Sequence, residues 1–188
     1  MIEIILLITA VIVFLLFLVL GYGIGTYNAL TSGKVDIDTQ FSNIKTEYQR
    51  RADMFMNLVE ATKSYKKFEK ETMIAVTEAR QGNFGSTRAD QVKKMSQLEG
   101  IFSKLFAVAE SYPNLKSNEQ HNKLMEEIRI TEDRVNIART DFNEECREYN
   151  ETLKVFPSNV VANMFAFKEV AYFQNEAGTE KAVRINLE

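Results

Sequence analysis

The chain has few of the residues that interrupt long helices. Its 188 residues include only 8 glycines and 2 prolines, and tryptophan is absent. Glycine and proline supply the turns of sheets, hairpins and disordered linkers, so their scarcity argues against a β-rich or linker-rich chain. A chain of this length has room for one membrane helix and one domain of ordinary size. We therefore predict an all-α fold with one core of long helices.

Histidine and cysteine are each present once, as His121 and Cys146. A single thiol cannot form an internal disulfide, and one histidine excludes most zinc sites and Cys-His or Ser-His catalytic arrangements. Cys146 falls on an apolar helical position and is interpreted as a buried structural thiol. His121 lies in a polar stretch and is interpreted as solvated. Because glycine-rich phosphate loops are also missing, we predict no catalytic residue, no metal site and no cofactor.

An excess of basic charge is lacking as well. The net charge is −3 and the isoelectric point is near 5.4. Binding to a phosphate backbone requires a basic face and an isoelectric point well above neutral. We therefore expect no nucleic-acid partner.

The clearest positive feature is an apolar run near the N-terminus. Between Ile4 and Leu20 the one polar side chain is Thr9, and residues 21–24 extend the run without a charge. About 20 apolar helical residues cross the roughly 30 Å of a bilayer's hydrocarbon. A cleaved signal peptide is the alternative, but the preceding Met-Ile-Glu has no basic residue and the run is long. We predict a single-pass anchor over residues 1–25 in the lipid bilayer of the cell membrane.

The orientation of the anchor follows from the basic residues near it. The first ones, Lys34, Lys45, Arg50 and Arg51, all lie C-terminal to the apolar run. Positively charged flanks stay on the cytoplasmic side of a membrane. We therefore expect the rest of the chain to be cytoplasmic.

Glycines mark the end of the apolar run. Gly21 and Gly25 have the small-xxx-small spacing at which two membrane helices approach closely, so they are candidates for a helix–helix contact. Together with Gly23, they are more readily interpreted as loosening the helix where it leaves the membrane, because glycine weakens helices.

Beyond residue 25, apolar residues recur at alternating steps of three and four, which is typical of packed helices. The first stripe begins at Phe41, and Asp36 or Asp38 could cap its helix. The expected elements are helices over 36–80 (with a possible break at 66–70), 92–112, 124–156 and 158–173, and a loop over 83–89. Near-heptad spacing favours an antiparallel bundle or coiled coil. We predict a helical bundle over 26–175 and a polar C-terminal tail over 176–188.

Several charged residues lie beside the apolar stripes. An arginine inside a bundle needs a carboxylate partner, because an unpaired buried charge costs several kcal/mol. We expect Arg139 or Arg51 to pair with Glu132, Glu110 or Asp53, although all could instead be surface residues without fixed partners. The candidates for a structural polar network are Arg51, Asp53, Glu110, Glu132, Arg139 and Asn143.

Short sequence motifs spread over nearly the whole chain resemble those of the LemA family. Residues 27–30 (YNAL) are similar to its YNxL element, and residues 50–59 (RRADMFMNLV) to its RRxDLxPNLV phrase. Further resemblances, to ExYPxLK, ExRxxxAR, YN and FPxN, are carried by residues 110–116, 132–139, 149–150 and 156–159. The order and spacing of these phrases agree with the family.

The resemblance implies an N-terminal anchor and long antiparallel helices, and it supplies no active site. Met56 stands where the family usually has proline, which implies a straighter helix here. Phe41 replaces a frequent tryptophan, and Phe142 replaces a tyrosine before asparagine. Members of this type are associated with bacterial envelopes, and magnetosome relatives suggest membrane shaping or protein recruitment.

Two functions from different classes are therefore expected. The first is a membrane-anchored scaffold that self-assembles as a homo-oligomer, because confinement to a membrane plane raises the effective concentration of long amphipathic helices. The second is an adaptor that recruits a membrane protease or a signalling protein. An enzyme would need a ligand pocket among Asp53, Glu110 and Arg139, and we do not expect one.

Overall fold

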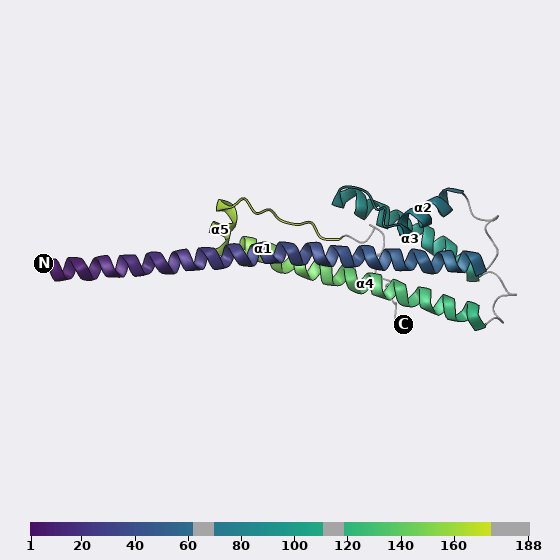
Figure 1. Ribbon diagram of the computed structural model, residues 1–188, viewed down its shortest axis with the longest axis horizontal. Helices are drawn as coiled ribbons and strands as arrows, with labels where there is room; N and C mark the ends of the chain where they lie inside the picture. Colours follow the sequence, from purple (N-terminus) through teal and green to yellow (C-terminus); the bar gives the residue numbers. More distant parts are fainter. Residues whose placement is uncertain (62–69, 111–118, 174–188) are drawn as a thin grey trace, which may run out of the picture. The chain divides into compact units, whose positions relative to one another are not determined.

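The computed structural model describes residues 1–61, 70–110 and 119–173 (Figure 1). Within these ranges the structure has α-helices and no strand, which confirms the predicted all-α class. The helices are α1 (Ile2–Ala61), α2 (Lys70–Arg80), α3 (Arg88–Glu110), α4 (Glu119–Lys154) and α5 (Ser158–Met164). The predicted tail over 176–188 lies outside the described residues, and so does the possible break at 66–70 except for Lys70, where α2 begins.

Helix α1 runs without interruption through the predicted end of the anchor. The prediction of a new helix at Asp36 or Asp38 was therefore wrong, and so was the loosening expected at the glycines near residue 25. No proline occurs in this stretch, and side chains well before Phe41 are already buried at helical spacing, which stabilises the helix there. These side chains are Thr26, Leu30 and Ile37.

The chain packs as two compact units. The first unit comprises Met1–Thr39 and Asn143–Tyr172, and the second comprises the described residues of Gln40–Phe142 together with Phe173. Each unit therefore takes one part of α1 and one part of α4.

In the second unit, α1 and α4 run in opposite directions, and the end of α2 is attached to α1. Arg80 at the end of α2 pairs with Asp53 of α1. Arg139 of α4 contacts Tyr48 of α1, and Glu132 of α4 contacts Arg51 of α1. Residue numbers therefore decrease along α4 in the direction in which they increase along α1. This order is the antiparallel arrangement predicted from the stripes.

Aromatic side chains fill the core of the second unit. The rings of Phe55 on α1 and Phe102 on α3 are stacked, with centroids 4.7 Å apart and planes 5° from parallel. Phe41 and Phe142 bring α1 and α4 together, with centroids 5.5 Å apart. Burial of such rings is the main apolar contribution to a bundle of this size. The predicted stripe residues that the structure buries here include Phe41, Ile44, Tyr48, Ala52, Phe55, Val59, Val76, Met95, Leu98, Phe102, Leu105, Ile128, Val135 and Phe142.

The predicted loop connects α2 to α3. Gly82 and Gly85 have φ angles of 72° and 108°, which other residues rarely adopt. Thr87 then caps α3, because its hydroxyl accepts a hydrogen bond from the Asp90 amide at 3.1 Å and donates to the Asp90 carboxylate at 2.6 Å. Phe84 within the loop is buried, with its ring centroid 6.3 Å from that of Tyr48.

The first unit contains the start of α1, the end of α4 and α5. The purple N-terminal part of α1 has no other described helix beside it in Figure 1, and its apolar side chains are exposed. Further along, Gly33 of α1 lies against Tyr149 of α4, where an added Cβ would meet the Tyr149 ring at 3.3 Å. Cys146 is buried on the same helix, as predicted.

The C-terminal helix is shorter than predicted. Helix α5 ends at Met164, and the chain then runs without regular structure to Phe173. The side-chain amide of Asn150 on α4 holds this segment, donating to the Val170 carbonyl at 2.8 Å and accepting from the Val170 amide at 2.9 Å. These bonds satisfy backbone groups that a helix would otherwise pair, so the apolar spacing over 165–173 did not produce a helix.

Two further expectations about single residues were wrong. His121 is buried near the start of α4, with 6% of its surface exposed, although its polar neighbours predicted solvation. Phe156 was assigned to the apolar stripe of the α4 helix, but α4 ends at Lys154 and Phe156 is 77% exposed.

Candidate functional site

Five polar side chains in the second unit converge from three helices and are called the ionic cluster. They are Tyr48 and Arg51 of α1, Glu99 of α3, and Glu132 and Arg139 of α4. The Glu99 carboxylate accepts hydrogen bonds from the Tyr48 hydroxyl at 2.7 Å, from Arg51 Nη1 at 2.6 Å and from Arg139 Nη2 at 2.7 Å. The second guanidinium nitrogen of Arg51 lies 3.3 Å from Glu132. One carboxylate thus joins three helices.

Burial makes these contacts stronger than ordinary surface ion pairs. The Arg51 side chain is 4% exposed and that of Glu99 is 26% exposed. The guanidinium of Arg51 also lies 4.9 Å from the Phe102 ring centroid, a cation–π distance. Attraction between unlike charges grows as water is excluded, and these hydrogen bonds offset part of the cost of removing the charges from water.

Tyr48 remains protonated in this cluster. Burial raises the pKa of its hydroxyl far above the usual range, and the nearby Glu99 carboxylate raises it further, while Arg139 lowers it. A protonated hydroxyl can donate to Glu99 and at the same time accept from Arg139, and the structure has both bonds.

The sequence had indicated part of this cluster. The structure brings together Arg51, Glu132 and Arg139, all of them named as candidates from the sequence. It adds Glu99, which sequence reasoning missed because its neighbours Gln97 and Gly100 look like a solvated stretch. A signal was present, since residues 95, 98, 99 and 102 lie on one face of a helix and the other three are apolar.

The other three candidates lie elsewhere. Asp53 pairs with Arg80 at 2.6 Å, and Glu110 pairs with Arg129 at 3.3 Å, and all four side chains are substantially exposed. Asn143 is half-buried and belongs to the first unit. These contacts place Asp53, Glu110 and Arg139, the residues among which an enzyme would need a ligand pocket, in three separate ion pairs.

The ionic cluster is suited to holding α1, α3 and α4 together. Both Glu99 oxygens already accept hydrogen bonds, so this carboxylate has little capacity left to bind a substrate proton or a metal ion. Among the side chains of the described ranges, no group of three or more His, Cys, Asp or Glu residues is placed to hold a metal ion.

The first unit contains an apolar groove beside the end of the apolar run, and we call it the exit groove. Its volume is about 590 Å³, and it is bounded by residues 19–27 of α1 and residues 156–165 around α5. The rings of Phe165 and Phe167 lie 4.8 Å and 5.6 Å from the ring of Tyr27 and attach the chain after α5 to α1. Side chains in the groove are almost all aliphatic or aromatic.

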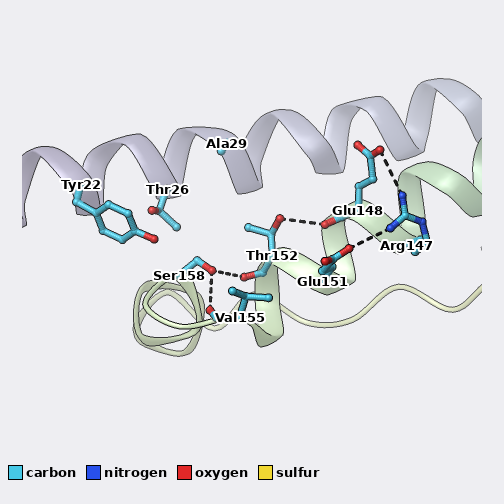
Figure 2. A pocket seen from close by; sticks show the side chains of 9 residues that line it. All are labelled: Tyr22, Thr26, Ala29, Arg147, Glu148, Glu151, Thr152, Val155 and Ser158. Atoms are coloured by element: carbon cyan, nitrogen blue, oxygen red, sulfur yellow. Dashed lines mark hydrogen bonds and ion pairs between the residues drawn. The ribbon is translucent and has the colours of Figure 1, made fainter.

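A second, polar hollow of about 480 Å³ lies in the same unit (Figure 2). Figure 2 shows Tyr22 and Thr26 on α1 and Ser158 at the start of α5. The charged lining residues, all on α4, are Arg147, Glu148 and Glu151. Arg147 contacts Glu144, Glu151 and Glu148 at 2.6, 3.0 and 3.6 Å, and the bond to Arg147 lowers the pKa of the Glu144 carboxyl.

The Ser158 hydroxyl fixes the start of α5. Its single hydrogen is shared between two backbone carbonyls at and just after the end of α4, with Oγ 2.6 Å from the Thr152 oxygen and 2.7 Å from the Val155 oxygen (Figure 2). This contact satisfies carbonyl groups that the last turn of a helix leaves without a partner. It therefore joins the start of α5 to the end of α4.

Gly21 and Gly25, the candidates for a helix–helix contact, lie on the exposed surface of α1. A Cβ atom added at either position would meet nothing within 4 Å, so no described part of the chain packs on them. A contact through these glycines with another membrane helix stays a prediction.

One helix in the described residues is long and apolar enough to cross a membrane, and it is α1. None of its most apolar window is buried by the rest of the described chain. Core helices of water-soluble proteins bury such a segment, whereas a lipid-facing helix leaves it exposed. The geometry agrees with an N-terminal membrane anchor.

Comparison with known proteins identifies relatives over most of the chain. Protein LemA of Metamycoplasma hominis is 28% identical over 169 residues, covering 86% of this chain and 77% of that protein. Magnetosome protein MamQ 1 of Paramagnetospirillum magneticum and magnetosome protein MamQ of Magnetospirillum gryphiswaldense are 26% and 25% identical over 177 residues. These matches cover 80% of this chain and 65% of the relatives, so the chain spans about two thirds of their length. The model of the LemA family matches residues 40–187, and the chain belongs to the LemA family.

Proposed function

We propose that this protein is a membrane-anchored structural scaffold whose helical bundle self-assembles at the membrane surface. The observation that carries the proposal is that α1 is both the exposed apolar segment and a packed element of the first unit. An anchor that continues directly into a packed helix places its protein at a set height above the bilayer. The name "magnetosome protein" of the MamQ relatives supports a role in organising a membrane.

An exposed apolar stripe on α4 supports self-assembly. Ile130 and Ile137 lie one heptad apart, and 42% and 59% of their surfaces are exposed. Two isoleucines bury too little area for a stable contact between free molecules. Anchoring in one plane raises the effective concentration, so a weak contact of this kind becomes sufficient. We assign a second copy of this chain as the partner that packs on this stripe.

Cysteine crosslinking tests the assembly. The single native thiol, Cys146, is buried, so an Ile137→Cys variant presents one accessible thiol per chain. In proteoliposomes treated with a short bismaleimide, we expect dimers from this variant at several times the yield of an Asn136→Cys control. Residue 136 is exposed on the same helix but lies about 100° around it.

The outcome also separates the scaffold from its rival. Equal, low yields at positions 136 and 137, with a monomer by sedimentation in mild detergent, would rule out assembly through this stripe. If the Ile137→Cys protein is instead joined in cells to one unlike protein at a fixed ratio, the adaptor for a membrane protease or signalling protein is supported.

The proposal includes a topology, with the bundle in the cytoplasm. Lys34 is the first charged residue after the apolar run, and the basic residues that follow it support this orientation. An enzyme that is active in one compartment, fused to the C-terminus, distinguishes the two orientations.

A further inference from the structure

The segment around α5 exposes an unusual concentration of apolar side chains. Phe156 is 77% exposed and Met164 is 69% exposed, and Val155, Val160 and Phe165 are each more than half exposed. No charged side chain occurs between Val155 and Phe167. A contiguous apolar patch of this kind marks a surface that another apolar phase covers.

The position of the patch along α1 indicates which phase that is. Residues 4–33 carry no charge, and as a helix they extend about 45 Å, more than the roughly 30 Å of a bilayer's hydrocarbon. The last turns of this stretch must therefore lie in the boundary between hydrocarbon and headgroups. The exit groove joins α5 to residues 19–27 of α1, which is where roughly the first 30 Å of this stretch ends and the boundary begins.

The residues around the patch suit such a boundary. Tyr22 and Tyr27 lie on α1 at the level of α5, where tyrosine is enriched because its ring is apolar and its hydroxyl is polar. Lys154 and Lys168 flank the uncharged segment, and their ammonium groups can remain among headgroups. Lys154 also pairs with Glu169 at 3.0 Å, which keeps the two ends of the segment together.

We propose that residues 155–167 form a second membrane contact, in which the exposed face of α5 inserts into the bilayer that α1 crosses and a lipid acyl chain occupies the exit groove. The groove is continuous with the lipid-facing surface of α1, so an acyl chain reaches it without leaving the hydrocarbon. The contact fixes the tilt and rotation of the anchor, because a helix held at two points cannot turn freely. This inference goes beyond the scaffold function and does not depend on self-assembly.

Quenching by brominated lipids tests the insertion in the full chain. The protein has no tryptophan, so each of the variants Phe156→Trp and Met164→Trp carries one emitter at an exposed site. In vesicles of phosphatidylcholine and phosphatidylglycerol, we replace the phosphatidylcholine with its acyl-brominated form. The fluorescence of both variants should fall about two-fold or more, since an interfacial segment lies roughly 5–10 Å into the headgroup and acyl boundary.

An Ile137→Trp variant is the matched control. Its site is 59% exposed on the α4 surface of the second unit, and its fluorescence should be the same in both kinds of vesicle. If brominated lipid leaves both the Phe156→Trp and the Met164→Trp variant as unquenched as this control, the inference is overturned. Blue-shifted but unquenched emission would then assign the patch to a second copy of the chain, and water-like emission would leave it in solvent.

Discussion

Glu99→Gln is expected to lower the free energy of unfolding by about 3 kcal/mol. Breaking a buried ion pair by removing one partner costs roughly 3–5 kcal/mol, and the lower end applies because the Glu99 side chain is 26% exposed. Glutamine keeps the size of the side chain but leaves the guanidinium groups of Arg51 and Arg139 without their shared negative charge. Urea titration of the full chain in mild detergent, followed by far-ultraviolet circular dichroism, measures the loss.

Glu132→Gln is the matched control for the same arginine. Glu132 lies 3.3 Å from Arg51, but its side chain is 56% exposed, so its charge contributes about 1 kcal/mol or less. Equal losses in the two variants would mean that Glu99 is not the residue that joins α1, α3 and α4. Salt separates them further, because screening weakens the exposed pair more than the buried one.

Phe102→Ala should destabilise the bundle by about 3–5 kcal/mol, the usual range for removing a buried phenylalanine. The Phe102 ring is fully buried, stacks on Phe55 and lies beneath the guanidinium of Arg51. Its loss opens a cavity and also removes a cation–π contact from the ionic cluster. The same urea titration gives the value.

The neighbouring Phe106 provides the comparison for this change. Its ring is partly exposed and lies 5.4 Å from the guanidinium of Arg129, so Phe106→Ala should cost about 1 kcal/mol, as cation–π contacts at exposed sites do. If Phe102→Ala were no more damaging than Phe106→Ala, the stacked pair would not be part of the core. Because Phe102 and Glu99 both contact Arg51, the double variant should lose less than the sum of the two single losses.

Periodicity predicted most of the helices in this fold. Steps of three and four placed α3 and α4 close to their observed bounds, because each buries one stripe of side chains. The continuity of α1 was missed, although Thr26, Leu30 and Ile37 extend the stripe of Phe41 backward at the same steps. The aspartates that looked like caps are exposed positions inside the helix.

What periodicity could not predict depends on contacts between distant residues. The segment after α5 has the apolar spacing of a helix, yet Asn150 pairs with the Val170 backbone twenty residues away and holds it extended. Glu99 similarly joins helices only through its contacts with Tyr48 and Arg51 of α1 and Arg139 of α4. The local spacing of apolar residues does not show which distant residues will be in contact.

Alkaline carbonate extraction of membranes that contain the intact chain tests the account most directly. The central claim is that α1 crosses a bilayer with its exposed apolar face in lipid, in which case washing at high pH leaves the protein in the membrane pellet. Peripheral proteins held by charge are released under the same conditions. Recovery of the intact protein in the supernatant would contradict the membrane anchor, and with it the proposed scaffold and the second membrane contact.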